Sequence, residues 1–356
     1  MLNEKKTDSF NDQMTTELEK LNRRSSLLMG LLVVAVVLTF SFCVGFGSLK
    51  IGLDELIKII FRFGDYDPVL SEIVWDIRFP RTIGALLGGA ALAVAGIMLQ
   101  VFFRNPIVEP FVLGISSGAV LCVALVMLGG ISLGFGAVSP MGLFLAALLG
   151  SSVVMVVVLM FATRVKDVVS LLVIGLMMGY ICSAVTSVLQ SFAEKEALQG
   201  FVVWTLGSFS GFTWASVRII VALCIPIFGS LVLLVKPLNA FSMGEEYAMS
   251  MGVNIKRFRI FLVAITSILA AVVTAFAGPV GFIGLAVPHL ARLLFKTADN
   301  KILVPGSILM GAIVTACCDL ISRTILAPVE LPISAVTAFI GAPIVIYLIM
   351  KRRTSL

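Results

Sequence analysis

Charged side chains are scarce in this chain. Only 13% of its 356 residues are Asp, Glu, Lys or Arg, whereas 59% are hydrophobic. A soluble globular domain has about 25% charged residues and about half apolar residues. The mean hydropathy of +1.10 therefore excludes an ordinary soluble domain and predicts a polytopic membrane protein.

The chain also has little of what enzymes and metal sites need. It has one histidine, His289, and six cysteines without a CxxC pair. One imidazole does not complete a metal site, so we expect His289 to pack within a span and the cysteines to be free. The HExxH, GxSxG and Walker A motifs are absent from the sequence. We therefore expect no catalytic centre, no metal and no cofactor on this chain.

Acidic residues inside the apolar runs are also few, with Glu109 and Asp319 near the ends of runs. Ion-coupled carriers place Asp and Glu side chains in the middle of the bundle. A secondary transporter thus stays an alternative of another class, and a membrane-embedded enzyme a third. If the protein is a pump, its energy has to come from another subunit.

Long apolar segments are what the chain does have. A helix needs about 20 apolar residues to cross a bilayer, and ten segments fit, at about 27–47, 82–103, 111–130, 139–163, 168–191, 212–235, 258–277, 279–295, 303–322 and 332–350. The predicted fold class is an all-α polytopic membrane protein with about ten transmembrane helices. We expect one transmembrane domain over 27–350, a polar tail over 1–26, either loose or an interfacial helix, and a basic C-terminus over 351–356.

The distribution of Lys and Arg indicates the orientation. If the N-terminus is cytoplasmic and ten spans alternate, eighteen of the 26 basic residues lie inside, as the positive-inside rule requires. Both termini are therefore predicted to be cytoplasmic, in the cytoplasmic membrane. The net charge of +6 is explained by this topology, so we expect membrane lipid and no nucleic acid as a partner.

Two segments outside the spans have helical patterns. In SLKIGLDELIKIIFRFG, apolar residues such as Leu53, Leu56 and Ile57 recur at helical spacing, which predicts an amphipathic helix on the outer surface. In the loop 191–214, residues 201–206 are expected to form a short outer helix, with a disordered loop as the alternative. Outside the helices, Pro106 and Pro110 force an irregular connection.

The segment SMGEEYAMSMGVNIKRFR, residues 242–259, interrupts the apolar pattern. Good helix formers lie between Gly244 and Met251, two glutamates lie in the first turn, where the helix dipole favours them, and Gly252 follows as a stop. In the predicted topology the segment 238–257 faces the cytoplasm. It is either a short helix that docks on a partner or a solvated connecting loop.

Four stretches resemble the permease subunits of type II binding-protein-dependent ABC importers, the family that takes up iron-siderophores, haem and cobalamin. These stretches are RFPRTIGALLGGAALAVAGIMLQVFFRNPIVEPFVLGISSGA (78–119), GEEYAMSMGVNIKRFR (244–259), AGPVGFIGLAVPHLARLL (277–294) and DLISRTILAPVELPISAVTAFIGAPIVIYLI (319–349). The resemblance covers the chain from about residue 27 onward. It implies ten helices per subunit, a second permease subunit, with a homodimer as the default, two cytoplasmic ATPase subunits that hold ATP and Mg, and an extracytoplasmic substrate-binding protein.

The resemblance also implies residue roles. Binding-protein docking falls on Arg78, Arg81 and Arg323. ATPase coupling falls on Gly244, Glu245, Glu246, Ala248, Met251 and Gly252. The cytoplasmic gate falls on Val168, Val169 and Ser170. Pathway or structural motif positions are Asn105, Pro106, Glu109, Pro110, Phe201, Trp204, Pro288 and His289.

The cargo is the point on which the sequence says least. Two valines at the gate favour a dewetted apolar constriction, and an apolar path with Met98, Met177 and Met178 suits a bulky, partly apolar chelate. A ferric siderophore is the first expectation from the breadth of the family, followed by haem and then cobalamin.

Overall fold

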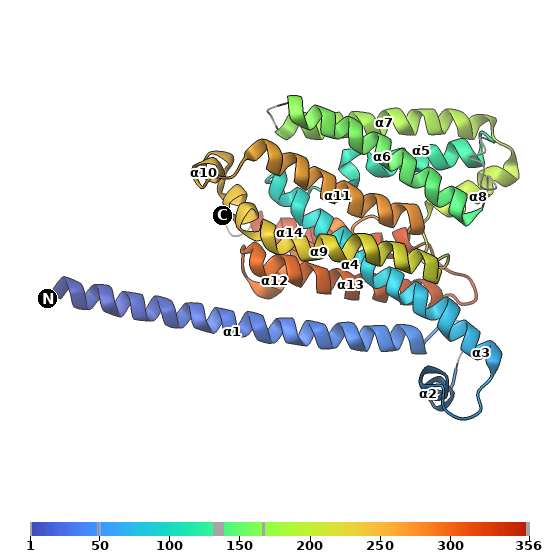
Figure 1. Ribbon diagram of the computed structural model, residues 1–356, viewed down its shortest axis with the longest axis horizontal. Coiled ribbons are helices and arrows are strands. Elements are labelled where there is room, and N and C mark those ends of the chain that lie inside the picture. The colour runs from blue at the N-terminus through green and yellow to red at the C-terminus, as the bar shows by residue number, and fades with distance from the viewer. Residues whose placement is uncertain (1, 48, 50, 131–138, 166–167, 354–356) are drawn as a thin grey trace.

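The computed structural model describes residues 2–47, 49, 51–130, 139–165 and 168–353, and within these ranges every regular element is helical (Figure 1). The helices are α1 Leu2–Gly45, α2 Leu53–Phe61, α3 Pro68–Glu72, the π-helix η1 Ile73–Arg78, α4 Phe79–Phe102, the short η2 Pro110–Leu113, α5 Ile115–Met127, α6 Pro140–Arg164, α7 Val168–Phe192, α8 Lys195–Thr205, α9 Trp214–Met243, α10 Glu245–Ser250, α11 Ile255–Ala277, α12 Ile283–Phe295, α13 Asn300–Thr324 and α14 Ile333–Arg353.

Seven of the described helical segments are long and apolar enough to cross a membrane. Three shorter apolar helices, Ile115–Met127, Ile283–Phe295 and Ile333–Ile346, occupy the remaining predicted spans. The prediction of an all-helical polytopic membrane protein is confirmed.

Helix α4 forms the centre of the bundle. It packs against α9, α11, α12 and α13, and its residues 88–102 are all buried. On one flank, α5 packs against α6 and α7, while α6 also contacts α11 (Figure 1). Helices α2, α3 and α8 lie at one end of the bundle, called here the α8 end, and α10 lies at the other, the α10 end.

Small residues allow the helices to approach closely. A Cβ atom built on Gly96 of α4 would lie 1.8 Å from the carbonyl oxygen of Gly284 in α12, and one on Gly150 of α6 would lie 2.0 Å from that of Gly118 in α5. No side chain fits at these crossings. This matches the small-residue packing that membrane helices use in place of a hydrophobic driving force.

The N-terminal segment differs from the loose-tail alternative. From Leu2 it forms the first half of α1, which projects past the bundle at the α10 end (Figure 1). The predicted amphipathic outer helix is α2, which buries Leu56 and Ile59 and exposes Leu53 and Ile57. The predicted short helix in the loop 191–214 is α8.

Candidate functional site

Arg78 is the last residue of η1, at the α8 end of the bundle, and it is 3% exposed. Its Nη1 donates hydrogen bonds to the carbonyl oxygens of Val44 (2.8 Å) and Gly45 (2.9 Å), and its Nη2 donates to that of Leu49 (2.5 Å). These carbonyls belong to the C-terminal end of α1 and the turn after it. Arg78 therefore joins α1 to the start of α4 through neutral acceptors.

Arg81, three residues later, lies between two carboxylates. Its Nε and Nη2 donate to Asp319 of α13 at 3.0–3.1 Å. Its Nη1 lies 2.6 Å from Oε1 of Glu330, and its Nη2 lies 3.1 Å from Oε2. Arg323 approaches the same aspartate, with its Nε 3.6 Å from Oδ2, and its Nη2 donates to the Cys43 carbonyl at 2.5 Å. The arginine cluster is defined here as Arg78, Arg81, Arg323, Asp319 and Glu330.

The arginine cluster is almost closed to solvent. Arg81 and Arg323 are each 4% exposed, and the side chain of Asp319 is 2% exposed. The side chain of Glu330 is 36% exposed and lies in the loop 325–332 between α13 and α14. The structure thus brings the three predicted docking arginines together but buries all three, and it covers Arg81 with Glu330, a residue to which the sequence assigns no role.

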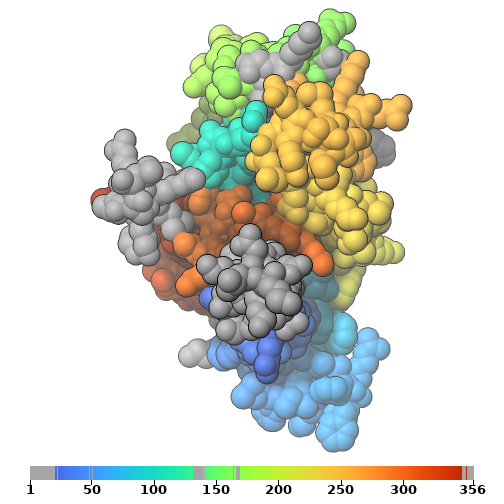
Figure 2. Space-filling view, turned by 90° about the vertical axis from the view of Figure 1, so that its left-hand side faces the viewer, coloured from blue at the N-terminus to red at the C-terminus, as the bar shows by residue number. Residues whose placement is uncertain are grey.

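At the opposite end, α10 is a one-and-a-half-turn helix held between two glycines. Gly244 has φ +132° and Gly252 has φ +83°, values that residues with a Cβ atom rarely adopt. The chain can therefore turn sharply out of α9 and back into α11. Figure 2 shows α10 and the adjoining turns at the surface, in gold, beside α9 and α11.

An ion pair fixes the base of α10. Arg259 of α11 donates from Nη2 to both carboxylate oxygens of Glu245, at 2.7 and 2.8 Å, while Ala248 is fully buried. Of the predicted coupling residues, Glu245 and Ala248 therefore face the bundle, whereas Glu246 and Met251 face out. The exposed apolar side chains around α10, which sequence reasoning did not single out apart from Met251, are Met243, Tyr247, Met249 and Met251.

The predicted gate lies at the start of α7. Val168 begins the helix, but its side chain is outside the described set; Val169 is 63% exposed and Ser170 is exposed. Further along α7, Met177 is exposed and Met178 is partly buried. Met98 is fully buried in α4, so the expectation that it lines the path is wrong.

Helix α8 presents different residues from those expected. Phe201 is 1% exposed and packs among side chains of α5 and α6, and Trp204 is partly buried. The neighbours Val202 and Val203 are exposed instead. If α8 borders the path, these valines rather than Phe201 are in position to do so.

The predicted motif residues of the 103–114 connection have structural partners. The Asn105 side chain accepts a hydrogen bond from the Ile107 amide (3.0 Å), within an irregular turn that contains Pro106. Glu109, just before Pro110, accepts from the amide of Phe282 (3.3 Å), a residue held at φ +67° at the start of α12. This contact ties the connection to α12.

Pro288 leaves the Gly284 carbonyl of α12 without its helical donor, because proline has no N–H. Gln100 of α4 supplies a donor, with its Nε2 3.3 Å from that oxygen, while its Oε1 accepts from Arg292 (2.8 Å). His289 Nδ1 lies 2.9 Å from the Leu285 carbonyl. Pro288 thus belongs to a polar contact between α12 and α4, whereas the hydrogen bond of His289 lies within α12. No cluster of three His, Cys, Asp or Glu residues that could hold a metal occurs among the described residues, and the six cysteines are free.

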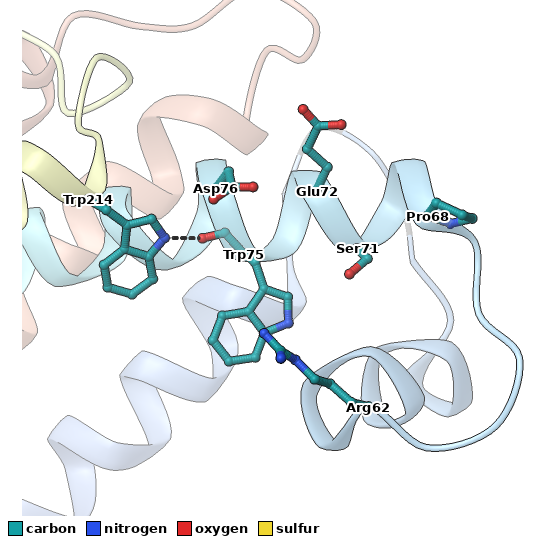
Figure 3. Close-up of a pocket in the computed structure, with 7 residues that line it drawn as sticks. All are labelled: Arg62, Pro68, Ser71, Glu72, Trp75, Asp76 and Trp214. Atoms are coloured by element: carbon teal, nitrogen blue, oxygen red, sulfur yellow. Dashed lines mark hydrogen bonds between the residues drawn. The ribbon is translucent and has the colours of Figure 1, made fainter.

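A hollow of about 520 Å³ lies at the α8 end (Figure 3). Trp214 of α9 donates from Nε1 to the Trp75 carbonyl at 2.9 Å, and the Arg62 guanidinium lies 5.3 Å from the centre of the Trp75 ring. The hollow lies between the end of α2, α3, η1 and the start of α9, and it contains none of the predicted path residues. Its lining is Arg62, Pro68, Ser71, Glu72, Trp75, Asp76 and Trp214.

Comparisons with known proteins identify the family and agree with the fold. Residues 31–351 match the model of the FecCD transport family. The chain is 38% identical over 289 residues to the vitamin B12 import system permease protein BtuC of Salmonella typhimurium, covering 81% of this chain and 87% of that protein. It is 33% identical over 348 residues to a candidate ABC transporter permease of Methanocaldococcus jannaschii, covering 93% and 97% of the two chains. It is also similar to a solved candidate metal-chelate type ABC transporter in an inward-facing conformation, with a TM-score of 0.81, 30% identity, and coverage of 92% of this chain and 99% of that one.

Proposed function

Because the chain belongs to the FecCD transport family, we propose that it moves a metal chelate from an extracytoplasmic binding protein across the cytoplasmic membrane, driven by two ATPase subunits. The chain is a multi-pass permease subunit of a binding-protein-dependent ABC importer, and it is not itself an enzyme. As a permease subunit it is expected to carry no cofactor, so ATP and Mg belong to the partner ATPases.

In this proposal the α10 end faces the cytoplasm and α10 is the coupling helix. Its four exposed apolar side chains offer a contact surface for an ATPase. Grouped exposed apolar side chains mark an interaction surface and are not typical of a solvated connecting loop. The Glu245–Arg259 pair transmits force, because it fixes the first turn of α10 to α11, which packs against the central α4. The predicted gate at Val169 and Ser170 lies toward the same end.

The α8 end then faces outward and receives the binding protein. The supporting observation is that three guanidinium groups and two carboxylates meet there, which leaves one positive charge unbalanced. Arginine binds carboxylates bidentately, so glutamates or aspartates of a binding protein are suitable ligands. Because the guanidinium groups are buried, docking has to approach them at the loop 325–332.

A second permease subunit completes the path. Helix α7 exposes apolar residues along its length, among them Val173, Tyr180 and Ile181, and α14 exposes Phe339 and Ile346. Apolar faces between two subunits suit a path for a partly apolar cargo, and a two-fold homodimer is the default for such an interface.

The cargo has three candidates within the metal-chelate class. The relatives named as vitamin B12 permeases, at 38% identity, favour a corrinoid, while a ferric siderophore is the prediction from the breadth of the family, with haem as its near alternative. The test is ATPase activity of the permease–ATPase complex in nanodiscs, with the binding protein loaded in turn with cobalamin, a ferric siderophore or haem. Stimulation by one loaded form identifies the cargo, and equal rates with loaded and unloaded protein contradict metal-chelate import.

A further inference from the structure

Glu330 occupies the face of Arg81 that a docking partner would need. The Arg81 guanidinium uses its Nε and Nη2 on Asp319 and its Nη1 and Nη2 on Glu330. Arginine has five N–H donors in one plane. The two edges of the guanidinium group that can donate a pair of hydrogen bonds to one carboxylate, Nε with Nη2 and Nη1 with Nη2, are both occupied here. A partner's carboxylate therefore has no free edge of Arg81 to bind.

The two carboxylates differ in how easily they leave. Asp319 is 2% exposed and lies within α13, where it contacts both Arg81 and Arg323. Glu330 is 36% exposed and lies in a loop whose residues Ile325, Leu326 and Val329 are also exposed. An ion pair with a partly exposed partner is easier to break than one whose two partners are both buried, because breaking the fully buried pair leaves an uncompensated charge away from solvent. Glu330 is therefore the carboxylate that an incoming partner displaces from Arg81.

Charge balance favours exchange over simple removal of Glu330. With Glu330 in place, the arginine cluster has one unbalanced positive charge, and without it the cluster has two. A carboxylate from outside restores the lost charge and the two hydrogen bonds. It adds no buried charge of its own, since it replaces one already present.

The loop that holds Glu330 continues into the helices proposed to line the path. Its Leu331 amide donates a hydrogen bond to the backbone carbonyl of Ser322 in α13 at 2.9 Å. Two residues on, the Ile333 amide donates to the Gly207 carbonyl at 3.3 Å, and the Ser334 hydroxyl donates to the Leu206 carbonyl at the end of α8. A shift of the loop therefore acts directly on the start of α14 and the end of α8.

We infer that Glu330 is an internal placeholder for a binding-protein carboxylate: it covers Arg81 in the undocked permease and is displaced on docking, which releases the loop 325–332 between α13 and α14. This inference rests on the proposed docking of a binding protein at the arginine cluster. It assigns to Glu330 a competing role, whereas a purely structural glutamate would only hold the loop.

The test measures the affinity of the nanodisc-reconstituted permease–ATPase complex for its cognate unloaded binding protein. Glu330→Gln removes the competing charge, and we expect docking to tighten by about two- to tenfold, as fits a partly exposed ion pair. Glu72→Gln is the matched control: it removes the same charge from an exposed residue at the same end, which makes no ion pair among the described residues, and should leave docking unchanged.

Arg81→Lys distinguishes failure of the placeholder role from failure of the docking site, because lysine keeps the charge but loses the bidentate geometry. If Arg81→Lys weakens docking while Glu330→Gln leaves it unchanged or weaker, the placeholder role is refuted and the docking site stands. If Arg81→Lys binds as tightly as the wild type, the docking site itself is refuted.

Hydrogen–deuterium exchange on the unmodified complex gives a readout that needs no variant. Docking should increase amide exchange in the loop 325–332 even though a partner covers that surface, because the Arg81–Glu330 contact is lost. Protection of this loop on docking would contradict the inference.

Discussion

Replacing Asp319 with Asn removes the carboxylate that Arg81 and Arg323 share. Breaking a buried ion pair by removing one partner costs about 3–5 kcal/mol, because the remaining charge stays buried. Here the amide keeps one acceptor oxygen but points an NH₂ group at the guanidinium groups, and Arg81 retains Glu330. We therefore expect Asp319→Asn to lower the free energy of unfolding by about 3 kcal/mol, the lower end of this range.

The assay is reversible unfolding of the permease in mixed micelles, titrated with a denaturing detergent and followed by tryptophan fluorescence. Asp76→Asn is the control, since Asp76 is exposed at the same end of the bundle and makes no ion pair among the described residues. It should change the unfolding free energy by less than about 0.5 kcal/mol. Equal effects of the two substitutions would show that the buried ion pairs do not stabilise this fold.

A double substitution sharpens this test. Asp319→Asn with Arg323→Gln removes one buried charge of each sign, so the pair should destabilise the fold by at least about 1 kcal/mol less than the sum of the single changes. Strict additivity would mean that the 3.6 Å contact between the two side chains has no energetic consequence.

Two further substitutions test the packing and the coupling. Gly96→Ala should destabilise the permease by about 1–3 kcal/mol or prevent its assembly, whereas Gly211→Ala, where an added Cβ meets no atom within 4 Å, should be tolerated; detergent unfolding compares the two. Glu245→Gln should lower transport per ATP hydrolysed in proteoliposomes, because it breaks the Arg259 pair at the base of α10, and the exposed Glu246→Gln should not. Equal transport by both variants would remove the anchoring role.

Most of the fold can be predicted from hydropathy and from the glycines and prolines that end helices. Each predicted span has a helix at its place, and the short α12 was expected because Pro288 interrupts an already brief apolar run. The sequence also predicts α10, because Gly244 and Gly252 flank a run of good helix formers. These signals are local, since they depend on residues within a few turns of one another.

The features that could not be predicted depend on contacts between distant segments. The predicted topology places Arg81 on the outer side of the membrane, but it does not show that Asp319 and Glu330, more than 200 residues away, cover it. Hydropathy alone likewise does not distinguish buried from lining apolar residues. For that reason the sequence points to Phe201 and Met98 as path residues, although both are buried in the structure.

The position of the ion pairs suggests how motion could pass between the two ends. Helix α4 packs tightly against α12 and α13 at glycine contacts and also packs against α11, and a packed core of this kind moves as a unit rather than bending. Ion pairs join this core to a peripheral segment at each end: Arg259 holds α10, and Arg81 holds the loop that carries Glu330. The core itself needs no internal switch, because each end has a separable contact whose loss alters the neighbouring helix. In the proposed function, binding-protein docking at the α8 end and ATPase contact at the α10 end therefore bias the same rigid unit from opposite sides of the membrane, which is the thermodynamic condition for coupling between two sites.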